Sequence, residues 1–547
     1  MPKIYERLFK LRTIAIFLLP TVYFLIARHF RVLLGDLSLR SSDPEYIYFM
    51  SGLNLSEGTL ELAHIDNPGT PLQILMALLF RIIWLVRGAP SVYIEDILAH
   101  PDFYLSVTSF TIAGLTTVLL LYAGKKIFES TGSVLLALLF QTAPFLPLIW
   151  FDLIGRVAPE LMMPFPVILL MVMTVSILKQ NSPVTNKQVL LLSLIAAFGL
   201  AIKLTFLPIW ILPFFLVGDW KQKIRFILLS LLGFFIIAFP VTLQWDIFWN
   251  WIKSLFLHSG QYGAGESNIL DPVALKSHIH ELFNLEKYFF ILFSILIVTL
   301  LAYLGWFRKK VEKKLSLVSL AVILVIVIQL VMVGKHFAHR YFIPVLMLSP
   351  LMIFLIFEMF KKIAPGENTT KSIQWAVLVL LLIQFRNNVH WFPVKNEAMG
   401  TDIVNRKMTL DVVKQLDKNS YKIIATQNYG CPFIEYILAY SQVWAKHEKR
   451  LEYTPVLNKL YPNVYNHFTW DNTLKYWGQA FDAGQIISSG KKIYLYTERD
   501  DEALYEKTLT KLHEESKTPF IAQKKVLFTN AANKETIYEL TFSHPEK

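Results

Sequence analysis

Residues 316–333 have the sequence SLVSLAVILVIVIQLVMV, a stretch without a single charged side chain. An apolar run of this length is long enough to cross the hydrocarbon core of a bilayer as a helix. Similar runs recur along the chain, in which 54% of the 547 residues are hydrophobic and 17% are charged. A soluble domain normally carries more charge and fewer apolar side chains. The composition therefore predicts a mainly α, polytopic membrane protein.

Eleven runs are candidate transmembrane helices. They cover approximately residues 13–34, 103–123, 133–150, 159–178, 189–202, 204–217, 226–243, 288–306, 316–333, 342–360 and 372–385. If the N-terminus lies inside, the inside connections are basic; they contain Lys125-Lys126, Lys179 with Lys187, Lys221/Lys223/Arg225, Arg308-Lys309-Lys310 with Lys313-Lys314, and Lys361-Lys362. Cytoplasmic loops normally collect Lys and Arg. This pattern predicts a cytoplasmic N-terminus and an external C-terminus.

The run at 71–86 differs from these eleven. It is short for a span and contains Arg81, and counting it as a crossing would invert every later loop. We therefore expect residues 35–102 to form one large external loop, in which 71–86 lies in the membrane interface or re-enters the membrane.

The chain changes character after about residue 390. Runs near 422–426, 491–497, 524–529 and 535–542 predict strands, whereas the stretches 432–451 and 502–515 predict helices. We expect residues 391–547 to form an extracytoplasmic α/β domain that follows a transmembrane domain of residues 1–390. This C-terminal part contains no nucleotide-binding fingerprint.

The net charge, the first apolar run and the cysteine count each exclude an alternative interpretation of the chain. The net charge of +12 comes mainly from basic residues between the apolar runs, so it does not indicate a nucleic-acid partner. The first apolar run is long and no small-residue cleavage site follows it, which predicts a retained helix and not a signal peptide. The single cysteine, Cys431, cannot form an intramolecular disulfide.

The first polar motif on the predicted outer face is Ser42-Asp43-Pro44-Glu45. Its two carboxylates lie at the membrane surface, where they can accept or hold a proton. Capping is the alternative explanation. Ser42 and Glu45 fit a capping box, and Asp43 before Pro44 fits an N-cap followed by proline at the first helical position.

Two more polar segments follow on the same predicted face. His64 and Asp66 precede a Pro-rich elbow at 67–72, which also fits an ordinary turn. Glu160 begins the run at 159–178, and Arg156 four residues earlier offers a simple ion-pair partner. Both segments therefore keep a structural and a functional interpretation.

Cationic side chains are predicted on this face as well. Lys203 lies between two short apolar runs, where a lysine must snorkel, pair or meet an anion. His339 and Arg340 lie between two spans on a face where positive charge is normally depleted. The glycine-containing loop with His258 and Tyr262 follows a Trp-rich, interface-like stretch and is either a substrate loop or a purely structural one.

Carboxylates and cations at headgroup depth suit the transfer of a sugar from a lipid phosphate. Cations stabilise the departing phosphate, and a carboxylate accepts the proton of the acceptor hydroxyl. Such a reaction requires no ATP, in agreement with a sequence that has no P-loop.

Together, these segments resemble the GT-C glycosyltransferase superfamily, specifically its bacterial branch of protein O-mannosyltransferase and aminoarabinose-transferase-like enzymes. The resemblance covers about residues 1–390 and rests on DPEY (43–46), NPGTPL (67–72), Pro159-Glu160, the Gly199/Lys203/Thr205/Pro208 hairpin and HRYFIP (339–344). The chain departs from the family pattern in three places: Pro44 separates the first-loop acids, GTPL replaces the usual Pro-Pro-Leu or His-Pro-Pro segment, and Glu160 stands where Asp is common.

The resemblance implies an inverting enzyme of the bacterial inner membrane that uses a polyprenyl-phosphate sugar. Its acceptor would be a hydroxyl of a glycolipid, a polysaccharide or a protein. It also implies Asp43 as the base, Glu45 as its support, Glu160 as the second acid, and Lys203 and Arg340 as ligands of the lipid phosphate. The full set of expected site residues is catalytic Asp43, Glu45 and Glu160; phosphate-binding Lys203, Arg340, His339 and Arg156; and substrate-loop His64, Asp66, His258 and Tyr262.

Two other functions fit the sequence less well. A transporter or flippase of lipid-linked sugars would place ionisable groups near the membrane midplane and often show repeated halves. A membrane-anchored envelope assembly protein would work through the C-terminal domain. Asp43, Glu45, His64 and Asp66 offer oxygen-rich ligands for a divalent ion, but we predict neither a metal nor another cofactor.

Overall fold

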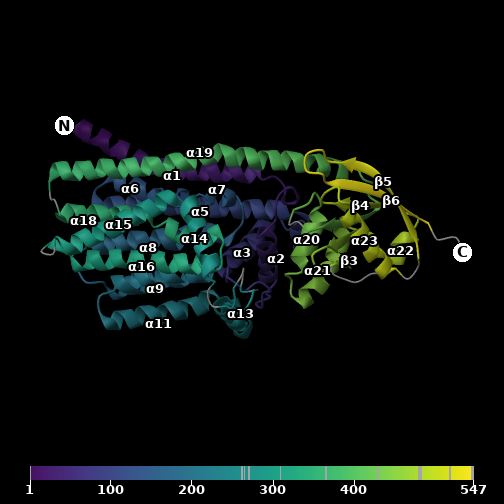
Figure 1. Ribbon diagram of the computed structural model, residues 1–547, viewed down its shortest axis with the longest axis horizontal. Helices are drawn as coiled ribbons and strands as arrows, with labels where there is room; N and C mark the ends of the chain where they lie inside the picture. The colour runs from purple at the N-terminus through teal and green to yellow at the C-terminus, as the bar shows by residue number, and fades with distance from the viewer. Residues whose placement is uncertain are drawn as a thin grey trace. The chain divides into compact units, whose positions relative to one another are not determined.

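The computed structural model describes residues 2–180, 182–259, 263, 265–268, 271–307, 310–363, 366–427, 430–477, 483–516 and 519–543. The chain is mainly helical and contains a six-stranded sheet in its C-terminal part (Figure 1). It divides into two compact units. The bundle unit comprises Met1–His29, Ile65–Leu72 and Phe110–Lys395, and the sheet unit comprises Phe30–His64, Gln73–Ser109 and Asn396–Lys547.

Six apolar segments among the described residues are long enough to cross a membrane. They are Ile14–Leu33, Pro101–Thr131, Pro159–Lys179, Lys287–Gly305, Lys313–Lys335 and His339–Ile363. Each coincides with one of the runs expected from the sequence. The prediction of a membrane protein with apolar helices is therefore confirmed.

The other five expected runs form shorter or more polar elements. They correspond to α6 (Val134–Gln141) with α7 (Trp150–Leu153), α9 (Asn186–Ile202), η4 (Leu204–Trp210) with α10 (Ile211–Leu216), α11 (Trp220–Ile237) with α12 (Phe239–Leu243), and part of α19 (Glu367–Val413). Helix α11 has 18 residues, and its three basic side chains all lie in its first turns, before the expected run at 226–243. Arg308 and Lys309, expected in a basic loop, lie outside the described residues.

The bundle unit consists of helices that run alongside one another, among them α8, α9, α11, α15, α16 and α18 (Figure 1). Besides the elements whose bounds are given above, the helical elements before the sheet, in chain order, are α1 (Pro2–Leu33), η1 (Leu37–Leu39), α2 (Glu45–Ser56), α3 (Thr70–Val86), α4 (Tyr93–Ala99), α5 (Pro101–Thr131), η2 (Ala143–Phe145), η3 (Pro159–Met162), α8 (Pro164–Lys179), α13 (Trp245–Leu257), α14 (Pro272–Leu285), α15 (Lys287–Gly305), α16 (Lys313–Lys335), η7 (His339–Phe342), α17 (Ile343–Leu346) and α18 (Ser349–Ile363). The run at 71–86 is thus a single helix, α3, of 17 residues.

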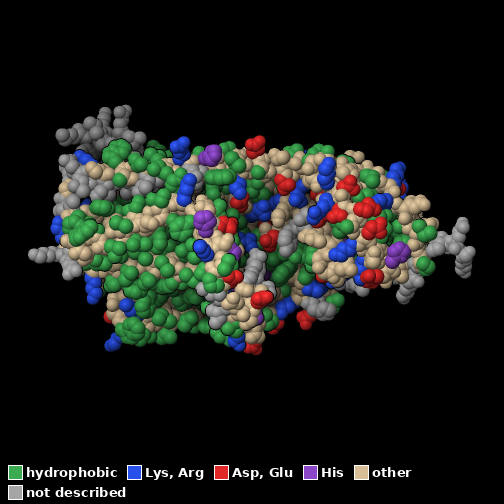
Figure 2. Space-filling model, viewed as in Figure 1, with side chains coloured by type: hydrophobic (Ala, Val, Ile, Leu, Met, Phe, Trp, Pro, Cys, Tyr) green, Lys and Arg blue, Asp and Glu red, His purple; other side chains and the backbone are tan. Residues whose placement is uncertain are grey.

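The outer surface of the bundle unit is apolar. Figure 2 shows hydrophobic side chains gathered over α8, α9, α11 and α16. Leu228 and Ile236 on α11 are 60% and 65% exposed, and Val298 and Leu301 on α15 are 65% and 64% exposed. An apolar surface of this extent is unfavourable in water and indicates a lipid environment.

The sheet has the strand order β3-β2-β1-β4-β6-β5. Its strands are β1 (Tyr421–Thr426), β2 (Val464–Phe468), β3 (Thr473–Lys475), β4 (Ile493–Thr497), β5 (Ile521–Thr529) and β6 (Thr536–Ser543), and its helices are α20 (Ile434–Gln442), α21 (His447–Leu460), α22 (Ala483–Ile487) and α23 (Glu502–Glu515). Strands β2, β1 and β4 are parallel, with Ile423 paired to both Tyr465 and Leu495. The outer strands β3, β6 and β5 join in antiparallel pairs.

The sheet is stabilised by burial of its central strands. All five residues of β4 are buried, as expected for a strand covered on both faces. The outermost strand β5 is mostly exposed and carries Lys524 and Lys525, charges that protect an edge strand from pairing with other chains. The four expected strands and the helix at 502–515 are confirmed, whereas β2 and β3 were not expected from the sequence.

The helical stretch expected at 432–451 is confirmed in part: the structure forms two helices there, α20 and α21, with a break between them. The break lies at residues 443–446, and the Arg450 side chain stabilises it. Its Nε donates to the backbone oxygens of Gln442 at 3.0 Å and Ala445 at 3.1 Å. A side chain five to eight residues further along the chain thus satisfies backbone oxygens at the place where the helix is interrupted.

Cys431 provides a reporter for opening of the sheet unit. The thiol is 0% exposed, and burial raises the pKa of Cys431 well above its ordinary value. Since the thiolate is the reactive form, we expect a maleimide to label the native protein at least about 100-fold more slowly than the protein unfolded in SDS. Mass spectrometry of timed samples measures this ratio. Equal labelling rates in the two states would contradict the buried position.

Candidate functional site

A buried cluster of one carboxylate and two cations forms in the bundle unit. Glu160 lies in η3, Lys203 follows the last residue of α9, and Arg340 lies in η7. The Glu160 Oε1 atom accepts a hydrogen bond from Lys203 Nζ, and Arg340 Nε lies 3.6 Å from the same oxygen. The side chains of Lys203, Glu160 and Arg340 are 5%, 2% and 25% exposed. The structure therefore brings together three residues that are far apart in the sequence.

Local backbone geometry delivers Lys203 to this cluster. Helix α9 ends because Lys203 is extended, with φ −162° and ψ 138°. The Phe206 ring then folds back against Gly199, where an added Cβ would lie 2.4 Å from ring atoms. The elbow predicted at 67–72 also reaches this helix end, since Gly69 N donates to Ile202 O at 3.1 Å. A glycine at 199 is thus required by the close approach.

Tyr341 completes the cluster. Lys203 Nζ lies 4.5 Å from the centre of the Tyr341 ring, and Arg340 Cζ lies 5.8 Å from it. A ring face at these distances attracts a cation. Gln329 fixes the turn from α16 by donating from Nε2 to Tyr341 O at 2.9 Å. Tyr341 was part of the sequence motif but was not among the expected site residues.

His339 lies beside the cluster but binds a different acid. Its Nε2 atom is 2.9 Å from Glu286 Oε1, and the same oxygen accepts from Leu148 N at 3.0 Å. Glu286 is 6% exposed and immediately precedes α15. Sequence reasoning missed Glu286, although a carboxylate at the start of a long apolar helix was a usable signal.

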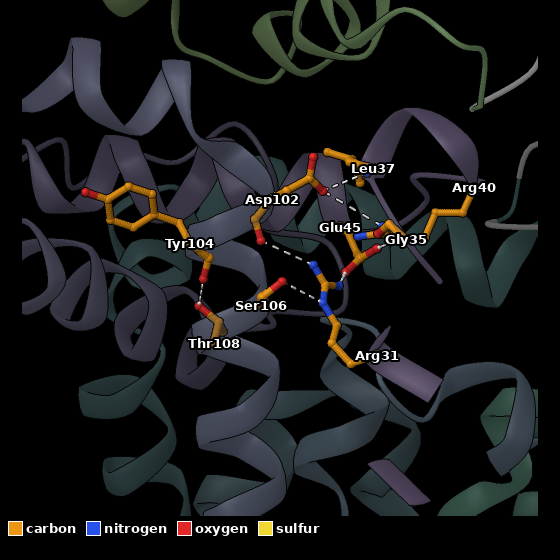
Figure 3. Close-up of polar contacts among 9 residues, drawn as sticks. All are labelled: Arg31, Gly35, Leu37, Arg40, Glu45, Asp102, Tyr104, Ser106 and Thr108. Atoms are coloured by element: carbon orange, nitrogen blue, oxygen red, sulfur yellow. Dashed lines mark hydrogen bonds and ion pairs between the residues drawn. The ribbon is translucent and has the colours of Figure 1, made fainter. Parts of the chain in front are cut away.

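The sheet unit contains a second buried charge cluster, built around Glu45 (Figure 3). Arg31 Nη1 donates to Glu45 Oε1 at 2.9 Å, and Arg40 Nε donates to Glu45 Oε2 at 2.8 Å. The Glu45 side chain is 0% exposed and both arginine side chains are 2% exposed. Each carboxylate oxygen is thus held by its own guanidinium group.

Asp102 extends this cluster to the start of α5. Its Oδ1 accepts from Leu37 N at 2.6 Å and lies 3.9 Å from Arg40 Nη1. Arg31 also reaches α5, where its Nε donates to Ser106 Oγ at 3.1 Å. The network therefore ties the end of α1, the 35–44 segment, α2 and α5 together, and Asp43 lies in the turn that it fixes.

The capping explanation of this motif is wrong. Helix α2 begins at Glu45, so Pro44 occupies the N-cap position and not the first helical position. The Glu45 carboxylate binds Arg31 and Arg40. Asp43 is half-buried in the turn before the helix.

The remaining expected site residues are divided between the units. In the sheet unit, His64 is 7% exposed, its Nε2 is 3.3 Å from Tyr48 Oη, and its ring packs edge-on against Trp444. In the bundle unit, Asp66 and Arg156 are half-buried and His258 Nδ1 is 3.2 Å from Gly265 O. Tyr262 lies outside the described residues. Asp43, Glu45 and His64 thus belong to one unit, and Glu160, Lys203, His339 and Arg340 to the other.

Metal ligands do not gather in the described part of the chain: no three His, Cys, Asp or Glu side chains there could hold one ion. Comparison with protein-family models and with curated proteins finds no match to this chain. The chemistry of the two charge clusters is consequently the basis for a function.

Proposed function

We propose that the protein is a membrane glycosyltransferase that moves a sugar from a polyprenyl-phosphate donor to an acceptor hydroxyl. The observation that carries the proposal is the cluster of Glu160, Lys203 and Arg340 in the bundle unit. Lys203 and Arg340 both lie beside the Glu160 carboxylate there, so two cations gather at one place among apolar helices.

Two neighbouring cations suit a lipid phosphate. Lysine and arginine side chains bind phosphate oxygens through charge-assisted hydrogen bonds, which are stronger than hydrogen bonds between neutral groups. In the proposed reaction, Lys203 and Arg340 bind the phosphate oxygens and stabilise the negative charge that grows there as the sugar leaves. Glu160 holds Lys203 in place before the donor binds, through a hydrogen bond to its Nζ.

The proposed reaction is a single displacement at the anomeric carbon. The acceptor oxygen forms a bond to this carbon while the bond from carbon to the phosphate oxygen breaks, and the lipid phosphate leaves with the electron pair. By the resemblance to GT-C enzymes, the proposal assigns Asp43 as the base that takes the proton of the acceptor hydroxyl. One displacement inverts the configuration of the sugar. Glu45, fixed by two arginines, positions the turn that carries Asp43.

The proposal includes a topology and a location. The eleven expected spans, a cytoplasmic N-terminus and an extracytoplasmic sheet place the reaction on the outer side of a bacterial inner membrane. The basic residues predicted in the inside loops support this orientation. A polyprenyl-phosphate sugar presents its phosphate at the headgroup depth expected for the site, and the acceptor is a glycolipid, a polysaccharide or a protein.

Arg340→Ala is expected to raise the KM for the lipid-linked donor. A hydrogen bond between charged groups contributes about 1.5–3 kcal/mol, which corresponds to about a 10-fold to 100-fold weaker interaction. The KM for the acceptor should stay unchanged, because Arg340 is proposed to face only the donor phosphate. Steady-state transfer by protein purified into nanodiscs, with each substrate varied in turn, measures both constants.

Arg386→Ala is the matched control, since Arg386 is an exposed arginine of α19 in the same unit. It should leave both KM values unchanged. Arg340→Lys retains the charge and should recover part of the donor affinity. An Arg340→Ala variant with wild-type donor KM would remove this residue from the donor site.

A further inference from the structure

The sheet unit contains a pocket that the proposed chemistry does not use. Its volume is about 620 Å³. The pocket is lined by residues of the segment 36–103, the end of α19, β1 and the start of α20, and by Tyr461. All of them belong to the sheet unit. Small-molecule sites typically have volumes of about 300–1,000 Å³, so the pocket has room for a ligand of one or two sugar rings.

Three of the residues that line the pocket are lysines. Lys414, Lys418 and Lys422 all line it. Lys422 lies 3.9 Å from Glu435, a long ion pair. Among the residues that the structure describes, neither Lys414 nor Lys418 has a carboxylate within ion-pair distance. Both are exposed and follow the last turn of α19, so their ammonium groups are available to an anionic ligand.

Other lining residues provide hydrogen-bond acceptors and aromatic surface. The Asp102 side chain is 34% exposed although its Oδ1 accepts from Leu37 N, and Figure 3 shows this carboxylate beside the Glu45 cluster. Asp36 is exposed as well. Phe103 is 46% exposed, and the Tyr461 ring is anchored by a 3.0 Å hydrogen bond from its Oη to Leu98 O. Ionised carboxylates accept hydrogen bonds from hydroxyl groups, and aromatic rings offer a rigid apolar surface.

We propose that this pocket binds a saccharide unit that carries a carboxylate or phosphate group. Lys414 and Lys418 bind the anionic group, and Asp36 and Asp102 accept hydrogen bonds from sugar hydroxyls. The rings of Phe103 and Tyr461 contact the C–H surface of the sugar. The binding of this saccharide is independent of the proposed function. Its identification as part of the acceptor rests on that function.

The first experiment measures binding to the full-length protein in nanodiscs. Saturation-transfer NMR with methyl glucuronoside, glucose 6-phosphate and neutral methyl glucoside compares a carboxylate, a phosphate and an uncharged sugar. We expect at least one anionic probe to bind at least about 10-fold more tightly than methyl glucoside, because a charged contact adds about 1.5–3 kcal/mol. The anionic probe that binds more tightly shows whether the pocket prefers a carboxylate or a phosphate. Equal binding of all three, or no binding of either anionic probe, would overturn the proposal.

The second experiment tests the residues. Lys414→Gln with Lys418→Gln should weaken binding of the anionic probe at least about 10-fold, whereas Lys525→Gln, an exposed lysine of β5, should not change it. Unchanged affinity in the double variant would also overturn the proposal.

Transfer assays separate this inference from the proposed function. A raised acceptor KM in the Lys414/Lys418 double variant supports the acceptor assignment. If the protein binds the probe through these lysines but shows no transfer activity, the inferred saccharide site stands and the proposed function is rejected. Normal transfer with an unchanged acceptor KM in the double variant would retain the enzyme and reject this pocket as its acceptor site.

Discussion

Asp43→Asn is expected to abolish measurable sugar transfer while the protein still folds and inserts. The amide has nearly the shape of the carboxylate but cannot accept the proton of the acceptor hydroxyl. General base catalysis typically contributes about 10²–10⁴-fold to a rate, so kcat should fall by about that factor. The donor KM should change little, because the proposed phosphate ligands Lys203 and Arg340 remain.

Asp411→Asn is the matched control. Asp411 is an exposed residue of α19 in the same unit as Asp43, and the change should leave kcat unaltered. Both variants are compared with the wild type in nanodiscs, with a radiolabelled polyprenyl-phosphate sugar and a panel of envelope acceptors. Wild-type kcat in Asp43→Asn would remove the assignment of Asp43 as the base. If maleimide labels Cys431 as slowly in the variant as in the wild type, any lost activity does not come from unfolding of the sheet unit.

Sequence reasoning identified the residues of the bundle-unit cluster for a physical reason. Lysine or arginine beside apolar runs has few acceptable environments, so a carboxylate or another anion must compensate its charge. Glu160, Lys203 and Arg340 all lie at ends of such runs, and the structure pairs them. Their proposed role in binding a lipid phosphate stays a prediction.

Local patterns failed where distant partners compete with them. The spacing of Ser42 and Glu45 matches a capping box, but two buried arginines hold the Glu45 carboxylate, one of them Arg31 in the preceding helix. Strand β2 escaped detection because it contains Asn466 and His467. Both are buried, and His467 is satisfied by Thr508 at 2.9 Å and Asn472 at 3.1 Å. Such partners become visible only when the chain is folded.

Glu45→Ala is expected to destabilise the sheet unit by about 3–5 kcal/mol, the usual cost of removing one partner of a buried ion pair. The substitution leaves Arg31 and Arg40, whose side chains are both 2% exposed, without the carboxylate that binds both. The loss should therefore exceed that of an ordinary surface pair. Maleimide labelling of Cys431 across an SDS titration measures the free energy of unfolding.

Glu452→Ala provides the comparison within the same unit. Glu452 is 50% exposed and pairs with Lys449 at 2.6 Å on the surface of α21, and exposed pairs contribute about 0–1 kcal/mol. The two substitutions remove the same charge, so the difference between them isolates burial. If Glu45→Ala unfolds at the same SDS concentration as Glu452→Ala, the Glu45 network does not stabilise the unit. The proposal that this network holds the Asp43 turn in place would then be rejected as well.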